Sequence, residues 1–323
     1  MIKSSNDVSS VSFGDFLLNP KNLETRKKEF FEKVNNLINW KLIVYRIEKL
    51  YDKAQGRPAF PALMMFKSLL LAQWYGLSDP ELEDCLKDRI SFKKFVELQI
   101  EDSVPDETTI CRFRNRLIEK NLLQKLFKII NQQLEEKGIF VQKGTLIDAS
   151  IINAGKGTKK TRDDQATWTK KGDKSYFGYK AHQAMDMESG LLNNLEMTTA
   201  KIPDCLIWDS LLHGKERAVF ADKGYYDQGY KRVLRTQDIY CGILDKNTTK
   251  RKLSTKQKKR NKRNSALRAP VERFFAVIKD QYRYMRARYR GLKKNTEHLF
   301  ALGIAFNIQR SISLLHPKPR TVV

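Results

Sequence analysis

The sequence predicts an α/β protein in which an all-helical N-terminal region precedes a mixed sheet flanked by helices. Apolar residues recur at helical spacing up to Gly138, and beyond it the period becomes strand-like. The later segments follow the order strand, hairpin, helix, strand, helix, strand, which is typical of a mixed α/β domain. We therefore predict a helical region at 1–138, an α/β domain at 139–316 and a tail at 317–323.

The chain carries a large excess of positive charge. Its 323 residues include 61 Lys and Arg against 37 Asp and Glu, which gives a formal net charge of +24. With 41% hydrophobic residues, it has the composition of a folded protein. A clustered excess of this size favours a polyanionic partner such as nucleic acid over a merely solvated basic surface.

Neither the cysteines nor the apolar segments indicate a zinc site or a membrane span. The four cysteines are far apart and form no CxxC pair, as is typical of reduced thiols in a cytoplasmic protein. The N-terminus has no apolar signal region. The longest apolar stretch, 61–74, is interrupted by Lys67 and Gln73, so we expect a cytoplasmic protein with no membrane partner.

The N-terminal region is predicted to be helical throughout. Ser78 begins a helix, because this polar cap precedes Pro80 in the first turn, and Gly76 ends the helix before it. The predicted helices are 23–52, 61–75, one from Ser78, 92–98, 106–117 and 118–137.

Three arginines lie among apolar residues in segment 106–117: Arg112, Arg114 and Arg116. Short helices at this spacing resemble a helix-turn-helix, whose last helix enters the major groove. We therefore name the three arginines as candidate DNA-binding residues. A plain helical bundle with an Arg-rich solvated face fits the same residues.

The second region is predicted from alternating and apolar runs. The expected strands are 143–152, 176–187, 191–199, 216–221 and 239–244, and the expected helices are 205–212, 227–235, 269–289 and one from Asn295. Residues 188–190 are the predicted hairpin turn between the second and third strands.

Two polar segments interrupt this pattern. Residues 155–173 are rich in Lys, Thr, Gly and Asp and are predicted to form a flexible loop. The basic segment 246–268 contains eleven Lys or Arg and no Asp or Glu. Because such a block repels itself unless an anion is present, we expect it to be disordered without nucleic acid.

Three carboxylates stand in unusual contexts. Asp148 lies inside the apolar run 145–152, where an unpaired charge is expensive to bury. Asp222 ends the run 218–222, at the strand end where open α/β sheets place ligands. Glu272 begins a helical pattern. Alone, the last two are ordinary turn and helix charges, but Asp is depleted in strands, and the order strand, strand end, helix favours one site.

Converging carboxylates fit divalent metal chemistry. Mg²⁺ prefers carboxylate oxygens and retains water and substrate phosphate as its remaining ligands. Two such ions about 3.5–4 Å apart activate a nucleophile and stabilise the leaving oxygen of an in-line phosphoryl displacement. Together with the positive charge, the three acids indicate metal-dependent chemistry on nucleic acid.

Cationic residues accompany the acids. Arg268, Glu272 and Lys279 share one helical face, so Arg268 is a candidate to hold a phosphate or orient Glu272, and Lys279 to contact the DNA backbone. A solvated Arg–Glu pair, worth only a few tenths of a kcal/mol, is the alternative. Lys180 and His182 alternate on a predicted strand and face one side; DNA contact is one interpretation of His182, and a structural role is the commoner one.

Several motifs agree, in order, with one known family. They are Arg57-Pro58-Ala-Phe-Pro through Phe95, Pro105-Asp-Glu-Thr-Thr-Ile-Cys-Arg-Phe-Arg, Ile147-Asp148-Ala-Ser, Gly178-Tyr-Lys180-Ala-His182, Ala221-Asp222-Lys-Gly-Tyr225 and Arg268-x3-Glu272-x6-Lys279. The chain resembles a DDE transposase of a bacterial insertion sequence, of the type grouped with insertion sequences 5 and 4. The last motif resembles the family's Tyr-x2-Arg-x3-Glu-x6-Lys signature, with Ser265 at the Tyr position.

The resemblance implies a ribonuclease-H-like catalytic core in which Asp148, Asp222 and Glu272 are catalytic and ligate two Mg²⁺ ions, with Mn²⁺ as an alternative. It implies cleavage of double-stranded DNA at the terminal inverted repeats of a transposon, followed by attack of the freed 3′-hydroxyl on target DNA. It places Lys180 and His182 beside the active-site sheet. It also implies a homodimer on DNA, associated with the bacterial nucleoid when bound.

Two other functions fit the same acids. One is a catalytically silent DNA-binding repressor derived from a transposase. The other is a ribonuclease-H-like nuclease acting on RNA–DNA hybrids or junctions. The N-terminal helical region and the basic segment 246–268 favour recognition of specific DNA ends.

Overall fold

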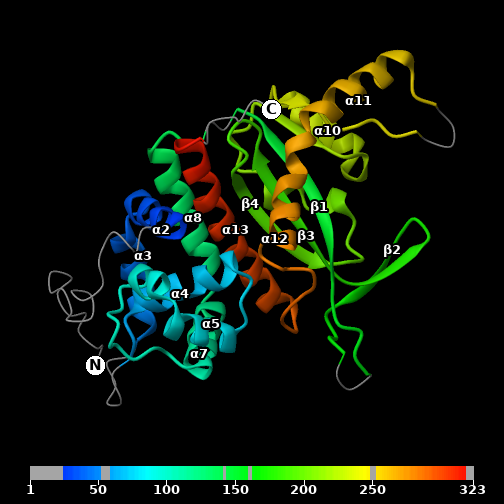
Figure 1. Ribbon diagram of the computed structural model, residues 1–323. Coiled ribbons are helices and arrows are strands. Elements are labelled where there is room, and N and C mark those ends of the chain that lie inside the picture. Colours follow the sequence, from blue (N-terminus) through cyan, green and yellow to red (C-terminus); the bar gives the residue numbers. More distant parts are fainter. Residues whose placement is uncertain (1–24, 52–58, 141–142, 159–161, 248–251, 318–323) are drawn as a thin grey trace, which may run out of the picture. The chain divides into compact units, whose positions relative to one another are not determined.

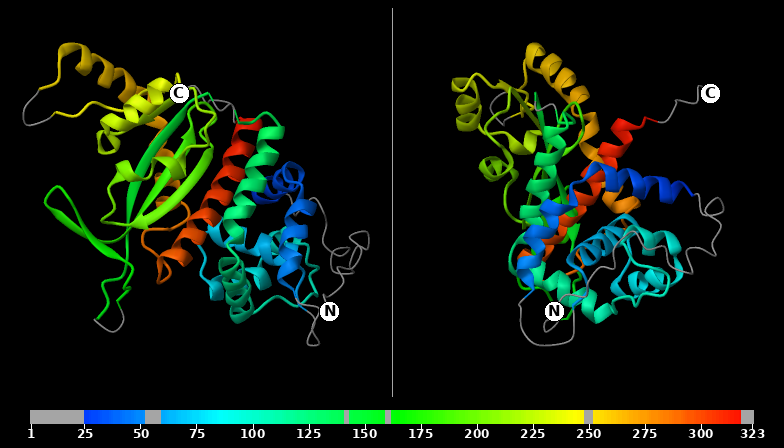
Figure 2. Two further views of the ribbon diagram at one scale, coloured as in Figure 1. Left: turned by 180° about the vertical axis from the view of Figure 1, so that it is seen from behind. Right: turned by 90° about the vertical axis from the view of Figure 1, so that its left-hand side faces the viewer.

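The computed structural model describes residues 25–51, 59–140, 143–158, 162–247 and 252–317 (Figures 1 and 2). The chain divides into two compact units, one of residues up to Gln133 together with those from Leu315 onward, the other Leu134–Leu314. Within the described ranges, no helix is both long and apolar enough to cross a membrane.

The first unit is helical. Its elements are α2 (Arg26–Leu37), α3 (Trp40–Ile47), η2 (Glu48–Leu50), α4 (Ala62–Trp74), α5 (Asp79–Asp88), α6 (Ile90–Phe95), α7 (Glu107–Glu119) and most of α8 (Leu122–Glu136). The helices predicted at 61–75, from Ser78 and at 106–117 are confirmed. Ser78 and Glu81 form a capping box on α5, and Gly76 follows α4 at φ +61°.

Two predicted helix boundaries are wrong because single residues leave the helical conformation. The helix expected at 23–52 is two helices: Ile38 is extended, and the Asn39 side chain caps α3 by accepting a hydrogen bond from the Lys41 N–H. The helix expected from residue 118 begins at Leu122. Asn121, at φ +49°, separates α7 from α8.

The second unit contains a mixed sheet with helices on both faces. Its strands are β1 (Thr145–Asn153), β2 (Thr167–Lys171), β3 (Lys174–Asp186), β4 (Leu192–Thr199), β5 (Ala218–Ala221) and β6 (Tyr240–Cys241). Its helical segments are η3 (Asp204–Leu206), α9 (Trp208–Leu211), η4 (Lys223–Tyr225), α10 (Gln228–Thr236), α11 (Thr255–Leu267), η5 (Ala269–Glu272), α12 (Arg273–Asp280) and α13 (Leu292–Leu315).

The strand order confirms the ribonuclease-H-like mixed sheet. The strands lie in the order β4-β3-β1-β5-β6, in which β1, β5 and β6 are parallel and β3 is antiparallel to β1. β2 extends the hairpin at the start of β3. The antiparallel β3–β4 pair is the hairpin predicted from the turn at 188–190, where Gly190 adopts φ +69°.

The two faces of the sheet are covered by different helices. On one face Ile147 and Ala184 pack in a buried cluster with Trp208 and Leu211 of α9 and Leu234 of α10. On the other lies α12, which is in front of the sheet in Figure 1 and behind it in the reverse view of Figure 2. Because side chains alternate along a strand, the polar residues of β1 are divided between these faces.

The loop predicted at 155–173 contains a strand that the sequence analysis missed. Residues 167–171 form β2, which pairs with the beginning of β3 around a turn at Gly172, φ +61°. Trp168 packs on Phe177 at a ring-centroid distance of 5.3 Å and remains 47% exposed. Tertiary pairing with β3 decides this segment, although its polar composition is typical of a loop.

The prediction that segment 246–268 is disordered is wrong for its second half, because residues 255–267 form α11. Residues 248–251 lie outside the described ranges. Ser254 and Gln257 form a capping box at its start, and Lys, Arg, Gln and Ala are good helix formers. Asn264 holds the helix to the sheet by donating to the Gly242 carbonyl at 3.2 Å.

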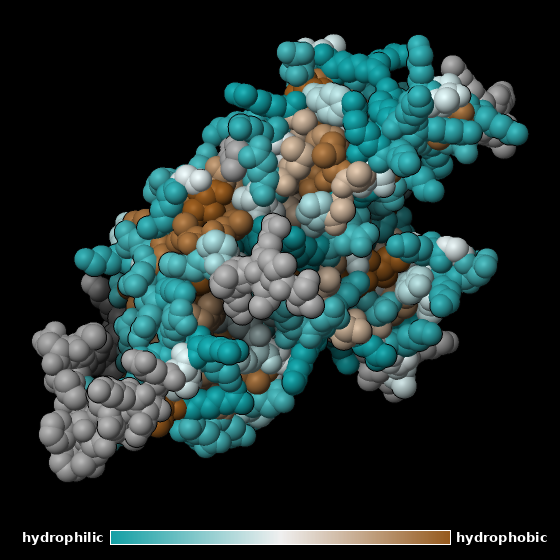
Figure 3. Space-filling model, turned by 45° about the horizontal axis from the view of Figure 1, so that its top comes forward, coloured by the Kyte–Doolittle hydropathy of each residue, from teal (hydrophilic) through white to brown (hydrophobic). Residues whose placement is uncertain are grey.

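On the face seen in Figure 3, hydrophilic side chains predominate and apolar ones form smaller patches.

The helix predicted at 269–289 is shorter than expected. Pro270 lies in the 3₁₀ turn η5, α12 ends at Asp280, and Arg283 adopts φ +54° in the irregular segment that follows. Tyr282 and Tyr284 are almost completely buried in this segment. Their burial shows that packing stabilises the turn against continuation of the helix.

Candidate active site

Two of the predicted acids follow adjacent parallel strands. The β1–β5 register pairs Ile147 with Ala221, so the next residues, Asp148 and Asp222, occupy neighbouring positions. Asp148 remains within β1, whereas β5 ends at Ala221 and Asp222 caps η4. The carboxyl end of the parallel strands is the edge where α/β sheets place their ligands.

The third acid comes from the segment that covers this face. Glu272 is the last residue of η5, which contacts β1, and its side chain is exposed. Gln183, the β3 partner of Asp148, donates a hydrogen bond to the Val271 carbonyl. This bond fixes η5 over the sheet at the level of Asp148 and so brings Glu272 to the same face.

The carboxyl group of Asp148 is affected by its burial and by the charges of the other two acids. Burial, with smaller contributions from the negative charges of Glu272 and Asp222, raises the pKa of Asp148 to about 6. The positive charge of Arg268 and the N–H of Ala149 lower it. The charges of Glu272 and Asp222 are therefore close enough to act on Asp148.

Arg268 lies beside the most buried acid. Its Nη2 is 3.5 Å from Asp148 Oδ1 and 3.4 Å from the Ile147 carbonyl oxygen, and its side chain is only 12% exposed. Its buried Nε–H has no hydrogen-bond partner among the described residues. The guanidinium therefore compensates Asp148 and keeps a donor available.

Lys279 reaches the same face from α12. Its Nζ donates to Ser150 Oγ at 2.8 Å, and Ser150 follows Asp148 on the same side of β1. Burial lowers the pKa of Lys279, Lys171 of the β2 strand lowers it further, and Asp148 raises it. Ser150 and Gln183 were not predicted as site residues, although the alternation of β1 would have identified Ser150.

The carboxyl groups of Asp148, Asp222 and Glu272 do not form a metal-binding cluster in the described structure. In the part of the chain that the structure describes, no three Asp, Glu, His or Cys side chains already lie close enough to hold a metal ion. Asp222 Oδ1 instead accepts a hydrogen bond from the Lys223 N–H at 2.5 Å. The structure therefore does not show the convergence of the three carboxyl groups that the sequence predicts.

His182 and Lys180 lie on the opposite face of the sheet, because they pair with Ala149 and Ile151 instead of Asp148. The ring of His182 is fully buried, so the interpretation that it contacts DNA is not supported by its position. Its two nitrogens are 3.0 Å from the Tyr225 hydroxyl and 3.1 Å from Thr198 Oγ1. Burial lowers the pKa of His182 to about 4, so the ring is neutral at ordinary pH.

Lys180 is likewise engaged inside the fold. Its Nζ donates to Asp204 Oδ1 and to the Ile202 carbonyl, both at 2.7 Å, and its side chain is 14% exposed. The pair ties β3 to η3. These contacts give Lys180 a structural role, and the DNA contact predicted for it stays a prediction.

The three arginines of α7 differ from one another. Arg114 forms a two-pronged ion pair with Asp79 of α5, at 2.5 and 2.7 Å, and its side chain is 12% exposed. Arg114 therefore links α7 to α5, and the DNA contact predicted for it stays a prediction. Arg112 and Arg116 are exposed, and DNA contact stays a prediction for them.

The fold and the acids together indicate a class of enzyme. A ribonuclease-H-like sheet that carries interacting acids at the ends of its central parallel strands, in a strongly basic chain, is typical of enzymes that displace phosphate esters in nucleic acids.

Comparison with family models gives the family. The chain belongs to the DDE transposases: the model "Transposase DDE domain" matches residues 140–308, and "Transposase domain (DUF772)" matches residues 19–116. The resemblance found in the sequence is thereby confirmed, and the protein is a transposase, a DNA-cleaving and strand-transferring enzyme.

Two solved structures are distantly similar. A piggyBac transposase synaptic complex with hairpin DNA is 12% identical, with 89% of this chain and 74% of that chain covered and a TM-score of 0.45. A pre-cleavage Mos1 transpososome is 11% identical, with 90% of this chain and 96% of that chain covered and a TM-score of 0.19. At these values neither bears on the function of this chain.

Proposed function

We propose that the transposase cleaves double-stranded DNA at the terminal inverted repeats of its transposon and joins the freed 3′-hydroxyl to target DNA, using Asp148, Asp222 and Glu272 as its catalytic carboxylates. The observation that carries this proposal is the placement of Asp148 and Asp222 at neighbouring positions of β1 and β5, where the charges of Asp222 and of Glu272 from η5 act on Asp148. Each acid has an ordinary structural explanation alone, but together they concentrate negative charge on one sheet edge.

The donor set suits a hard divalent cation. Carboxylate oxygens are the ligands that Mg²⁺ and Mn²⁺ prefer, and Asp148 is held in a partly buried position where added positive charge is favourable. We propose two ions per site, which would polarise the scissile phosphate and activate the attacking oxygen when bound. Asp148, Asp222 and Glu272 would hold them.

The neighbouring cations have roles that follow from their contacts. Arg268 stabilises the charge of Asp148, and its remaining buried N–H is available to a phosphate oxygen. Lys279, anchored on Ser150, presents its positive charge beside the acids, where a DNA backbone must pass to be cleaved. Both residues orient the substrate and neutralise charge, and neither needs to transfer a proton.

Two transposon ends have to be held together before they are joined to one target. We therefore propose a homodimer on DNA and a cytoplasmic, nucleoid-associated location. The net charge of +24 supports association with DNA. Mass photometry of the protein with and without end DNA measures the state directly: two chains per pair of ends is the expected stoichiometry.

The test is a cleavage and strand-transfer assay on the DNA ends that flank the gene, in Mg²⁺. Asp148→Asn, Asp222→Asn and Glu272→Gln should each abolish both steps and still bind the ends. Glu188→Gln, which changes an acid of the β3–β4 turn that is 42% exposed, is the matched control and should remain active. Strand transfer by any one of the three active-site variants would show that its acid is not catalytic.

A further inference from the structure

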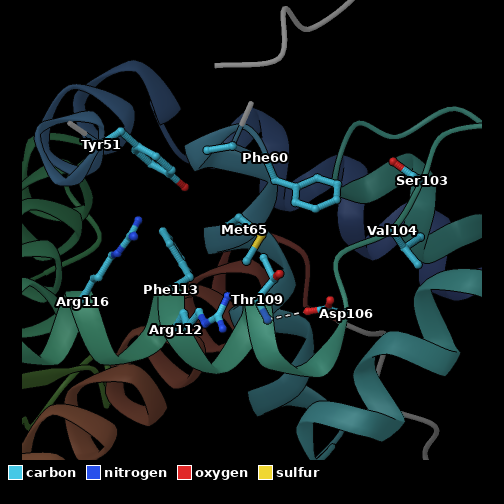
Figure 4. Close-up of a pocket in the computed structure, with 11 residues that line it drawn as sticks. Tyr51, Phe60, Met65, Ser103, Val104, Asp106, Thr109, Arg112, Phe113 and Arg116 are labelled. Atoms are coloured by element: carbon cyan, nitrogen blue, oxygen red, sulfur yellow. Dashed lines mark hydrogen bonds between the residues drawn. The ribbon is translucent and has the colours of Figure 1, made fainter. Parts of the chain in front are cut away.

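The helical unit contains a pocket that the proposed chemistry does not use. It has a volume of about 370 Å³ and opens between Tyr51 at the end of η2, Phe60 before α4 and the first three turns of α7. Figure 4 shows Phe113 and Arg116 extending from α7 toward Tyr51. All of its lining residues belong to this unit, so the pocket is a feature of the helical unit itself.

One side of the pocket is cationic. Arg112 and Arg116 are one helical turn apart and both line it. Neither forms an ion pair with a described carboxylate, in contrast to Arg114 between them, which is held by Asp79. The acid that lines the pocket, Asp106, caps α7 by accepting the Thr109 N–H at 2.6 Å. Two guanidinium groups are therefore available to an anion.

The other side is aromatic. The rings of Tyr51 and Phe113 lie nearly parallel, at 27°, with their centroids 6.5 Å apart, and Phe60 lines the same space. Burial raises the pKa of Tyr51 to about 12, against the smaller opposing effect of Arg116, so its hydroxyl is a hydrogen-bond donor at neutral pH. This side of the pocket is therefore suited to a flat apolar group with polar edges.

We propose that this pocket binds one unpaired nucleotide of the DNA substrate, with its base against Tyr51 and Phe60 and its phosphate on Arg112 and Arg116. A flat ring joined to an anion is the chemistry that aromatic and guanidinium groups recognise together. A base inside a duplex is stacked on both faces and presents only its edges, so an occupant of the pocket has to be unstacked. The proposal rests on the proposed function in that DNA is the source of the nucleotide.

The test is an equilibrium binding measurement in EDTA, which prevents cleavage. Fluorescence anisotropy compares a fully paired duplex of transposon-end sequence, the same duplex with one unpaired nucleotide, and a third with an abasic residue at that position. Base stacking implies a preference of about tenfold for the unpaired nucleotide over both others. Tyr51→Leu and Arg116→Gln should abolish this preference.

The controls separate the pocket from general charge and from folding. Lys120→Gln removes one exposed positive charge of the same unit and should weaken binding of all three duplexes equally. Tyr51→Phe keeps the ring and should retain most of the preference, so it separates the contribution of the ring from that of the hydroxyl.

The outcomes distinguish this proposal from the proposed function. Tight binding of all three duplexes with no preference would overturn the pocket assignment alone. Failure to bind any duplex would overturn DNA as the substrate. Competition by a free deoxynucleoside monophosphate as effective as that of the unpaired duplex would show a site for free nucleotides instead, and would also overturn the proposal.

Discussion

Polar residues that lie one register position apart, on the two faces of the central sheet, differ in burial and in hydrogen bonding. Asp148 on β1 faces α12, is partly exposed, and keeps an incompletely compensated charge. His182, paired with the neighbouring Ala149, is fully buried, neutral, and hydrogen-bonded at both nitrogens. A polar strand residue is thus a candidate catalytic residue where its charge or hydrogen-bonding capacity is only partly satisfied. Where all of its polar atoms are hydrogen-bonded, its role is structural.

The comparison predicts its largest effect for Asp148→Asn. Cleavage of end DNA should fall by at least about a thousandfold, because a metal ligand supplies several kcal/mol to the transition state. Thermal stability without metal should be unchanged or higher, since the substitution removes a charge that burial disfavours. Single-turnover cleavage and a thermal melt in EDTA measure the two properties. An Asp148→Asn protein that melted far below wild type would place Asp148 among the structural residues.

A smaller effect is expected for Arg268→Gln. Loss of a partner that orients and compensates a metal ligand typically costs about 10- to 100-fold in metal affinity or activity. The Mg²⁺ concentration for half-maximal cleavage measures this change. Lys262→Gln, an exposed residue of α11 with the same change in charge, is the control and should behave as wild type. If the two substitutions changed the Mg²⁺ dependence equally, Arg268 would contribute only its positive charge to DNA binding and would not orient a metal ligand.

On the opposite face of the sheet, a substitution should lower stability without reducing strand-transfer activity. His182→Leu leaves the Tyr225 hydroxyl and Thr198 Oγ1 without a partner, which should lower the free energy of unfolding by about 2–3 kcal/mol. Strand transfer per folded molecule should remain within about threefold of wild type at low temperature. Urea denaturation and an active-site-titrated assay separate the two quantities; the exposed His316→Leu is the control. Loss of strand transfer at full stability would contradict the division between faces.

The smallest predicted effect is a pH dependence from the same histidine. The pKa of His182 is lowered to about 4 by burial, so the unfolded chain binds a proton more readily than the fold does. The stability contributed by neutral His182 is present above the unfolded pKa near 6.5 and is lost as pH falls toward 4. Between about pH 7 and 5.5 this amounts to about 1 kcal/mol. Urea denaturation at several pH values measures the free energy of unfolding of wild type and of His182→Gln. Between pH 7 and 5.5 the wild-type value should fall by about 1 kcal/mol more than that of His182→Gln. An equal fall in both proteins would mean that the ring titrates normally.

The sequence was most informative where local chemistry and burial agree. Capped helices such as α5, the β3–β4 hairpin and the apolar strands β1 and β5 were predicted because their residues favour the same conformation locally and in the fold. It was least informative for β2 and α11, whose polar and basic compositions resemble loops and disorder. Pairing with β3 and hydrogen bonds to the end of β6 stabilise these two elements, and neither interaction is local.

The sequence by itself determined that Asp148, Asp222 and Glu272 are unusual, because strand and helix periodicity expose a misplaced acid without reference to distant residues. It could not decide which polar strand residues share a face with them. That decision depends on the strand register, which places Lys279 and Gln183 with Asp148 but His182 and Lys180 behind the sheet. Register is a tertiary property, since a shift of one residue exchanges the two faces while leaving every local pattern intact.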